Sequence, residues 1–86
     1  MERDVKVLLL VEPTRGVDVG AREEIYRAIR ALTEGGLAVL VATSDHEEVV
    51  QLADRALIMV RGRIVRELSG DQVTGSEIVA AAGGLP

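Results

Sequence analysis

Two short, almost unbroken runs of aliphatic residues stand out in the first half of the chain, at residues 5–11 and 37–43. Such runs are typical of strands that are covered on both faces, as in parallel sheets. Pro13 ends the first run, because proline has no N–H to donate to a sheet ladder. The pattern therefore predicts two strands that require cover on both faces. One long and two short predicted helices can supply only part of that cover, so an open apolar face is expected.

The segment between these runs has the periodicity of an amphipathic helix from about residue 19 to residue 34. Asp18 precedes it, and its side chain is expected to cap the helix by accepting a backbone N–H. Gly35 and Gly36 follow it, and glycine takes the left-handed conformation that ends helices without strain. The apolar stripe expected to face the core comprises Ile25, Ala28, Ile29 and Leu32. Strand, helix and strand with short joints predict a parallel, right-handed βαβ unit.

The second half of the chain predicts shorter elements. Ser44 and Glu47 match a capping box, which predicts a short helix to about residue 53. Strands are expected at 56–60 and 63–68, and the two residues between them, Arg61 and Gly62, predict a tight hairpin. A last helix is expected at about 76–82. The fold class is therefore α/β, with a parallel core of two or three strands, a C-terminal hairpin and helices around them.

Composition removes several classes of function. The chain has 86 residues, a net charge of −4 and a pI near 4.9, which argues against a nucleic-acid binder and a polybasic membrane module. Without cysteine and with one histidine, the chain is expected to hold neither a thiolate nor a histidine-rich metal site. That histidine, His46, is expected at the surface, at a helix start. The chain has no run long enough to span a membrane, and no secretory leader is expected.

Glu12 is the clearest candidate for chemistry. It directly follows the first predicted strand, and ligands of open α/β sheets bind beyond the carboxyl ends of the strands. A carboxylate there can orient a water molecule or hold a metal-bound one. The alternative is a solvated loop glutamate, and the residues alone leave both readings open.

The residues around Glu12 are more specific. Residues 8–21 read Leu-Leu-Leu-Val-Glu-Pro-Thr-Arg-Gly-Val-Asp-Val-Gly-Ala. This stretch resembles the Walker B and D-loop region of ABC-type ATPases, and in particular the second cassette of ribose-, galactose- and xylose-type sugar importers. The resemblance continues over residues 24–26, 36–41, 53–59, 62–65 and 78–82, and so covers essentially the whole chain. It implies part of a P-loop NTPase fold.

By this resemblance, Glu12 takes the place of the glutamate that positions the attacking water. Gly16, Val17 and Asp18 fall in the D-loop, which meets the partner cassette. Ser44 falls at the switch position, where many cassettes have a histidine that touches the γ-phosphate. These roles are implied by the family pattern and not by the spacing alone.

The chain also departs from the family pattern. Val11 stands where the family has the aspartate that supports magnesium, and valine offers no oxygen. The phosphate-binding loop G-x-x-x-x-G-K-[ST], the glutamine loop and the Leu-Ser-Gly-Gly signature do not occur. Residues 1–86 are therefore expected to be the C-terminal part of a cassette, with phosphate binding supplied by other sequence.

The resemblance implies a parent activity of ATP hydrolysis coupled to sugar uptake at the cytoplasmic face of the plasma membrane. The ligands would be ATP and Mg²⁺, and the partners would be the rest of the cassette, a second cassette and permease subunits. The chain alone is expected to be inactive and to bind neither ligand tightly. Two alternatives remain: a non-catalytic module that docks on a complete cassette through an uncovered apolar face, and a gene remnant.

Overall fold

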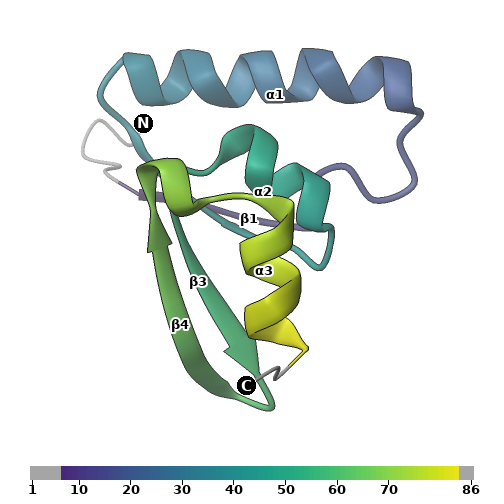
Figure 1. Ribbon diagram of the computed structural model, residues 1–86. Coiled ribbons are helices and arrows are strands. Elements are labelled where there is room, and N and C mark those ends of the chain that lie inside the picture. Colours follow the sequence, from purple (N-terminus) through teal and green to yellow (C-terminus); the bar gives the residue numbers. More distant parts are fainter. Residues whose placement is uncertain (1–6, 84–86) are drawn as a thin grey trace. The chain divides into compact units, whose positions relative to one another are not determined.

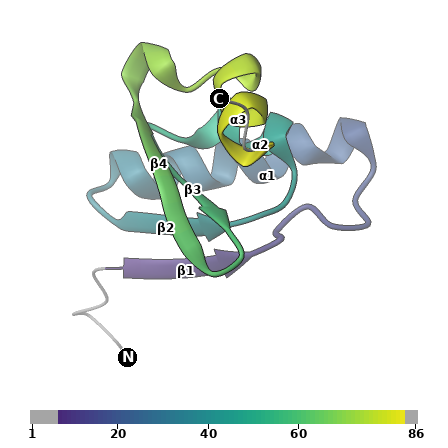
Figure 2. The ribbon, with the colours of Figure 1, turned by 60° about the horizontal axis from the view of Figure 1, so that its bottom comes forward.

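A computed structural model of the protein describes residues 7–83, which form two units that divide after Ser44. A parallel pair of strands forms the centre of the first unit. Strands β1 (Val7–Val11) and β2 (Ala38–Ala42) are joined by helix α1 (Val19–Glu34), as Figure 1 shows. They pair in parallel from Val7 opposite Ala38 to Val11 opposite Ala42 (Figure 2). The parallel βαβ unit is thus confirmed, although the predicted residues 5 and 6 lie outside the described part.

Only one face of this sheet is covered, which agrees with the expectation that an apolar face of these strands stays open in this chain. Side chains alternate between the two faces of a strand. On one face Val7, Leu9 and Val11 of β1 are 62%, 58% and 66% exposed, and Leu40 of β2 is 56% exposed. The alternating residues of both strands are half-buried, and α1 packs against β2. The pair leaves an apolar face open, defined here as the open sheet face of Val7, Leu9, Val11 and Leu40.

Helix α1 ends as the glycine pair predicts. Gly36 has a φ of 102°, and its N–H donates to the Thr33 carbonyl at 3.0 Å. The Leu37 N–H donates to the Leu32 carbonyl at 3.1 Å. These two bonds form a Schellman motif, which satisfies carbonyls that the helix leaves unpaired. The left-handed residue is Gly36, whereas Gly35 is the C-cap with a negative φ.

The buried face of α1 differs from the predicted stripe. Tyr26 and Ile29 are buried and Ile25 is half-buried, but Ala28 and Leu32 are exposed. The buried side of α1 is therefore centred on Tyr26 and Ile29 and not on the predicted stripe. The reason is that a helix buries the side that its tertiary neighbours cover, and the largest side chain of this helix lies there.

An antiparallel hairpin carries the core of the second unit. Strands β3 (Arg55–Val60) and β4 (Arg63–Ser69) are joined by Arg61 and Gly62, whose φ values of 53° and 80° are those of a type I′ hairpin turn. A 3₁₀ turn (Gly70–Gln72) leads to helix α3 (Gly75–Ala82), which packs on the hairpin. The buried apolar side chains of this unit are Ala56, Ile58, Leu68, Val73 and Ile78.

Helix α2 (His46–Leu52) begins one residue later than its sequence pattern predicts. Its N-cap is Asp45, whose carboxylate accepts the N–H groups of Glu47 at 3.0 Å and Glu48 at 3.3 Å. The predicted capping box of Ser44 and Glu47 is therefore wrong. Aspartate caps a helix as well as serine does, and the Ser44 N–H is engaged elsewhere.

Candidate functional site

Glu12 lies immediately beyond β1 and is fixed by its backbone. Its N–H donates to the Ala42 carbonyl at 2.8 Å, which extends the β1–β2 ladder by one bond. Its carbonyl accepts the Arg15 N–H at 3.1 Å and closes a turn. The φ of Glu12 is 47°, in the left-handed region that residues other than glycine seldom adopt. The side chain is half-buried.

The carboxylate of Glu12 accepts two hydrogen bonds from the residues that follow β2. Thr43 Oγ1 donates to Oε1 at 3.2 Å, and the Ser44 N–H donates to Oε2 at 3.1 Å. Parallel strands end at the same edge of a sheet, so the two strand ends meet here. The structure therefore brings together Glu12 and Ser44, two residues that the sequence analysis singled out.

Thr43 is the member of this group that the sequence analysis missed. A signal for it was present, because its hydroxyl follows β2 just as Glu12 follows β1. The burial of Thr14, a polar residue in the loop after Glu12, was not predicted either. Thr14 is only 3% exposed, inside the turn after Glu12, and its carbonyl accepts the Val17 N–H at 3.0 Å.

Val11 lies at the end of β1 with 66% of its surface exposed, opposite Ala42 in the ladder. An aliphatic side chain cannot ligate a cation directly or through water. In residues 7–83 no three His, Asp or Glu side chains are grouped so as to hold a metal ion. The edge of the sheet thus presents one carboxylate, that of Glu12, next to an exposed valine.

The predicted D-loop residues form the connection from Glu12 to α1. Gly16 has a φ of 77°, and the Val17 carbonyl accepts a bond from Arg22 Nε at 3.3 Å. Asp18 is the N-cap by position, but its side chain makes no capping bond. The expected side-chain cap is therefore wrong, and it is the Asp18 carbonyl that accepts the N–H groups of Ala21 and Arg22. The Asp18 side chain is exposed.

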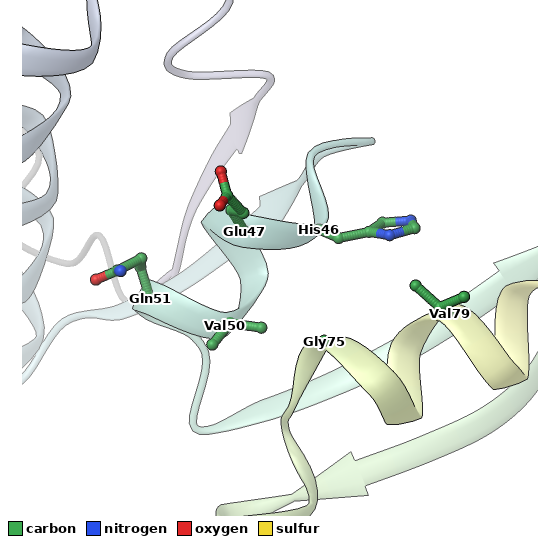
Figure 3. Close-up of a pocket in the computed structure, with 6 residues that line it drawn as sticks. All are labelled: His46, Glu47, Val50, Gln51, Gly75 and Val79. Carbon is green, nitrogen blue, oxygen red and sulfur yellow. The ribbon is translucent and has the colours of Figure 1, made fainter.

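A shallow groove of about 340 Å³ lies in the second unit between α2 and α3. Figure 3 shows His46 above Val79 and Val50 directed toward Gly75, while Glu47 and Gln51 point away from α3. His46 is exposed at the first residue of α2, as predicted. Every residue that lines the groove is exposed, so the groove has no buried polar group that would orient a ligand.

Two ion pairs occupy arginines of the hairpin. Arg66 bonds to Glu77 of α3 at 3.0 Å, and Arg55 bonds to Glu67 across the strands at 3.2 Å. Their side chains are about half exposed, and such surface pairs contribute little to stability. None of the helices within residues 7–83 combines the length and apolar character needed to cross a bilayer.

Comparison with known proteins identifies the family. The chain is 52% identical over 79 residues to the ribose import ATP-binding protein RbsA 1 of Streptomyces avermitilis, covering 92% of this chain and 15% of that protein. It is 47% identical over 85 residues to the ribose import ATP-binding protein RbsA 2 of Rubrobacter xylanophilus, covering 99% of the chain and 16% of the relative. The corresponding protein of Rhizobium meliloti is 45% identical over 82 residues. No protein-family model matches the chain.

Over nearly its whole length, the chain is homologous to one part of the ATP-binding proteins of ABC-type sugar importers. Its α/β architecture is accordingly part of the P-loop NTPase fold of an ABC cassette. It spans about 15% of the length of the S. avermitilis relative.

Proposed function

We propose that this chain supplies the water-orienting glutamate and the D-loop of an ABC cassette that hydrolyses ATP to drive sugar import. Glu12 is the residue that orients the attacking water. The observation that carries the proposal is its carboxylate at the carboxyl end of β1, held at both oxygens by Thr43 and Ser44. The similarity to ribose import ATP-binding proteins supports ATP hydrolysis coupled to sugar import as the reaction.

ATP and Mg²⁺ are the ligands of this proposed activity, and sequence outside the chain provides most of their binding. Phosphoryl transfer needs the phosphates to be cradled and their charge neutralised by a cation. The chain holds no phosphate-binding loop, and Val11 offers the cation no oxygen. Glu12 therefore contributes to the chemical step, and the rest of the cassette contributes nucleotide binding.

The D-loop residues Gly16, Val17 and Asp18 meet the partner cassette in this proposal. Their exposure supports it, because Gly16 and Asp18 are exposed and Val17 is half-buried. Ser44 lies at the switch position and faces the nucleotide. Permease subunits hold the assembly at the cytoplasmic face of the membrane.

A graft tests the proposal. In the S. avermitilis relative, the 79 matching residues are replaced by those of this chain, giving what we name the grafted cassette. Hydrolysis of Mg-ATP is compared between the grafted cassette and its Glu12→Gln variant, each with valine and with aspartate at position 11. The proposal expects that glutamine lowers hydrolysis at least about 100-fold in a background that hydrolyses ATP. Equal rates with glutamate and glutamine in both backgrounds would overturn it.

A second candidate function is a non-catalytic module that docks on a complete cassette. Two observations favour it: Val11 at the cation position and the open sheet face. In that case the separate chain binds an intact importer subunit in trans, and Glu12→Gln changes neither this binding nor the subunit's hydrolysis. If the separate chain binds the intact subunit, leaves its ATP hydrolysis unchanged and binds equally well as the Glu12→Gln variant, the non-catalytic module is favoured over the catalytic function.

A further inference from the structure

The Glu12 carboxylate is held by donors at both of its oxygens. Thr43 Oγ1 donates to one oxygen at 3.2 Å, and the backbone N–H of Ser44 donates to the other at 3.1 Å. Both donors come from the two residues that directly follow β2. We refer to this arrangement, Glu12 with Thr43 and Ser44, as the carboxylate clamp.

The backbone of Glu12 is also held by hydrogen bonds. The N–H of Glu12 donates to Ala42, and its carbonyl accepts from Arg15. A left-handed conformation at a residue other than glycine costs about 1 kcal/mol or more, and it persists only where the surroundings determine it. The φ of 47° therefore indicates that these contacts together hold Glu12 in one orientation.

We propose that Thr43 is a positioning residue: its hydroxyl holds the Glu12 carboxylate in a fixed orientation before nucleotide arrives. The inference rests on the proposed function for what Glu12 then does to water. Position 44 contributes its backbone N–H to the clamp, so the clamp does not require a particular side chain there. The hydroxyl of Thr43 cannot be replaced in this way.

The clamp leaves the carboxylate able to bind water. An ionised carboxylate has about four lone-pair sites, and the clamp uses two of them. The remaining sites can accept a hydrogen bond from water. A group held in place beforehand needs no reorganisation at the chemical step, and a displacement of about 1 Å can cost as much as about 100-fold in rate. Thr43 thus acts through Glu12 and does not itself touch the reacting atoms.

Amide hydrogen exchange resolved to single residues tests the clamp in the grafted cassette, where the rest of the fold is present. The Glu12 carboxylate accepts the Ser44 N–H at 3.1 Å, so slow exchange of this amide that depends on Glu12 reports on the clamp. We expect Thr43→Val to speed this exchange about fivefold and Glu12→Ala to abolish the protection, whereas Thr43→Ser and Ser44→Ala keep it. In the Glu12→Ala background, Thr43→Val should have no further effect. A wild-type Ser44 amide that exchanges as fast as an unstructured one overturns the clamp.

The rate of hydrolysis tests the positioning role. In the grafted cassette, Thr43→Val should lower the Glu12-dependent kcat about tenfold with little change in KM for ATP, and Thr43→Ser should restore it. Thr33→Val is the matched control, since Thr33 also loses a hydroxyl that donates at 2.8 Å, but on the exposed side of α1. Glu12-dependent hydrolysis that Thr43→Val leaves unchanged overturns the inference and leaves the proposed function standing. If hydrolysis by the grafted cassette does not depend on Glu12 at all, the proposed function is overturned. Hydrogen exchange at Ser44 then still tests whether the clamp exists.

Discussion

At the scale of single residues, we propose that Val11 stands where ABC cassettes have the aspartate that supports Mg²⁺. Val11 ends β1 at the carboxyl edge of the sheet, and its side chain is largely exposed in the separate chain. We predict that Val11→Asp in the grafted cassette tightens Mg²⁺-dependent ATP binding about tenfold, because a carboxylate returns beside the cation. Titration with ATP with and without Mg²⁺ measures this. Equal affinity with valine and aspartate would show that position 11 is not next to the cation.

Glycines on either side of Asp18 give a second prediction at this scale. Gly16 has a φ of 77°, whereas Gly20 lies inside α1, and a Cβ at either position would meet open space. Gly16→Ala should therefore lower the free energy of unfolding by about 1 kcal/mol through backbone strain alone. Gly20→Ala should raise it by about 0.5 kcal/mol. Urea midpoints of the grafted cassette measure both. A shift of the same sign in the two variants would contradict the placement of Gly16 in a left-handed turn and of Gly20 in a helix.

At the scale of elements, the hairpin of β3 and β4 has one buried and one exposed face. Leu68 is fully buried in the core of the second unit, whereas Met59 is 62% exposed. We predict that Leu68→Ala costs about 3 kcal/mol of unfolding free energy, through lost burial and the cavity left behind. Met59→Ala should cost less than about 0.5 kcal/mol. Thermal unfolding of the grafted cassette compares the two, and similar losses would mean that Met59 is covered in the assembly.

The elements themselves were largely predictable from the sequence. Apolar runs located β1 and β2, the glycine pair located the end of α1, and Arg61 with Gly62 located the hairpin turn. These signals are local, because each depends on backbone preferences within a few residues. The start of α2 was misplaced because Ser44 and Asp45 are both good caps, and only the contact of the Ser44 N–H with Glu12 decides between them.

The site was predictable only in part, for a physical reason. Glu12 could be recognised from its place after a strand and from its neighbours in sequence. Its contact with Thr43 spans 31 residues of sequence and depends on the parallel register of β1 and β2. The buried side of α1, likewise, depends on what packs against it. Such long-range contacts produce no pattern among neighbouring residues from which they could be predicted.

At the scale of the whole molecule, the sequence contains no phosphate-binding loop of the G-x-x-x-x-G-K-[ST] type and no carboxylate at position 11. One held carboxylate can orient water, but it cannot cradle phosphates or neutralise their charge. We predict that the purified chain with Mg-ATP releases phosphate no faster than a buffer control. A steady-state assay with the Glu12→Gln chain alongside checks this. Turnover that Glu12→Gln abolishes would mean that the chain builds a nucleotide site of its own.

We propose that this chain is one part of a cassette and needs the remainder to complete its fold. The open sheet face exposes four large aliphatic side chains, and β1 and β2 pair only with each other in the described residues. Faces and strand edges of this kind recruit partners or self-associate. Neither a disulfide nor a strongly aromatic core compensates, since the chain has no cysteine and one aromatic residue, Tyr26.

Sedimentation velocity and hydrogen exchange on the purified chain distinguish one part of a cassette from an independent domain. We predict either concentration-dependent association or a loosely packed monomer whose β1 and β2 amides exchange rapidly. Once the chain is grafted into the relative, both strands should exchange slowly. A monodisperse monomer with slow exchange throughout Val7–Val11 and Ala38–Ala42 would contradict this proposal, because the chain would then be an independent domain.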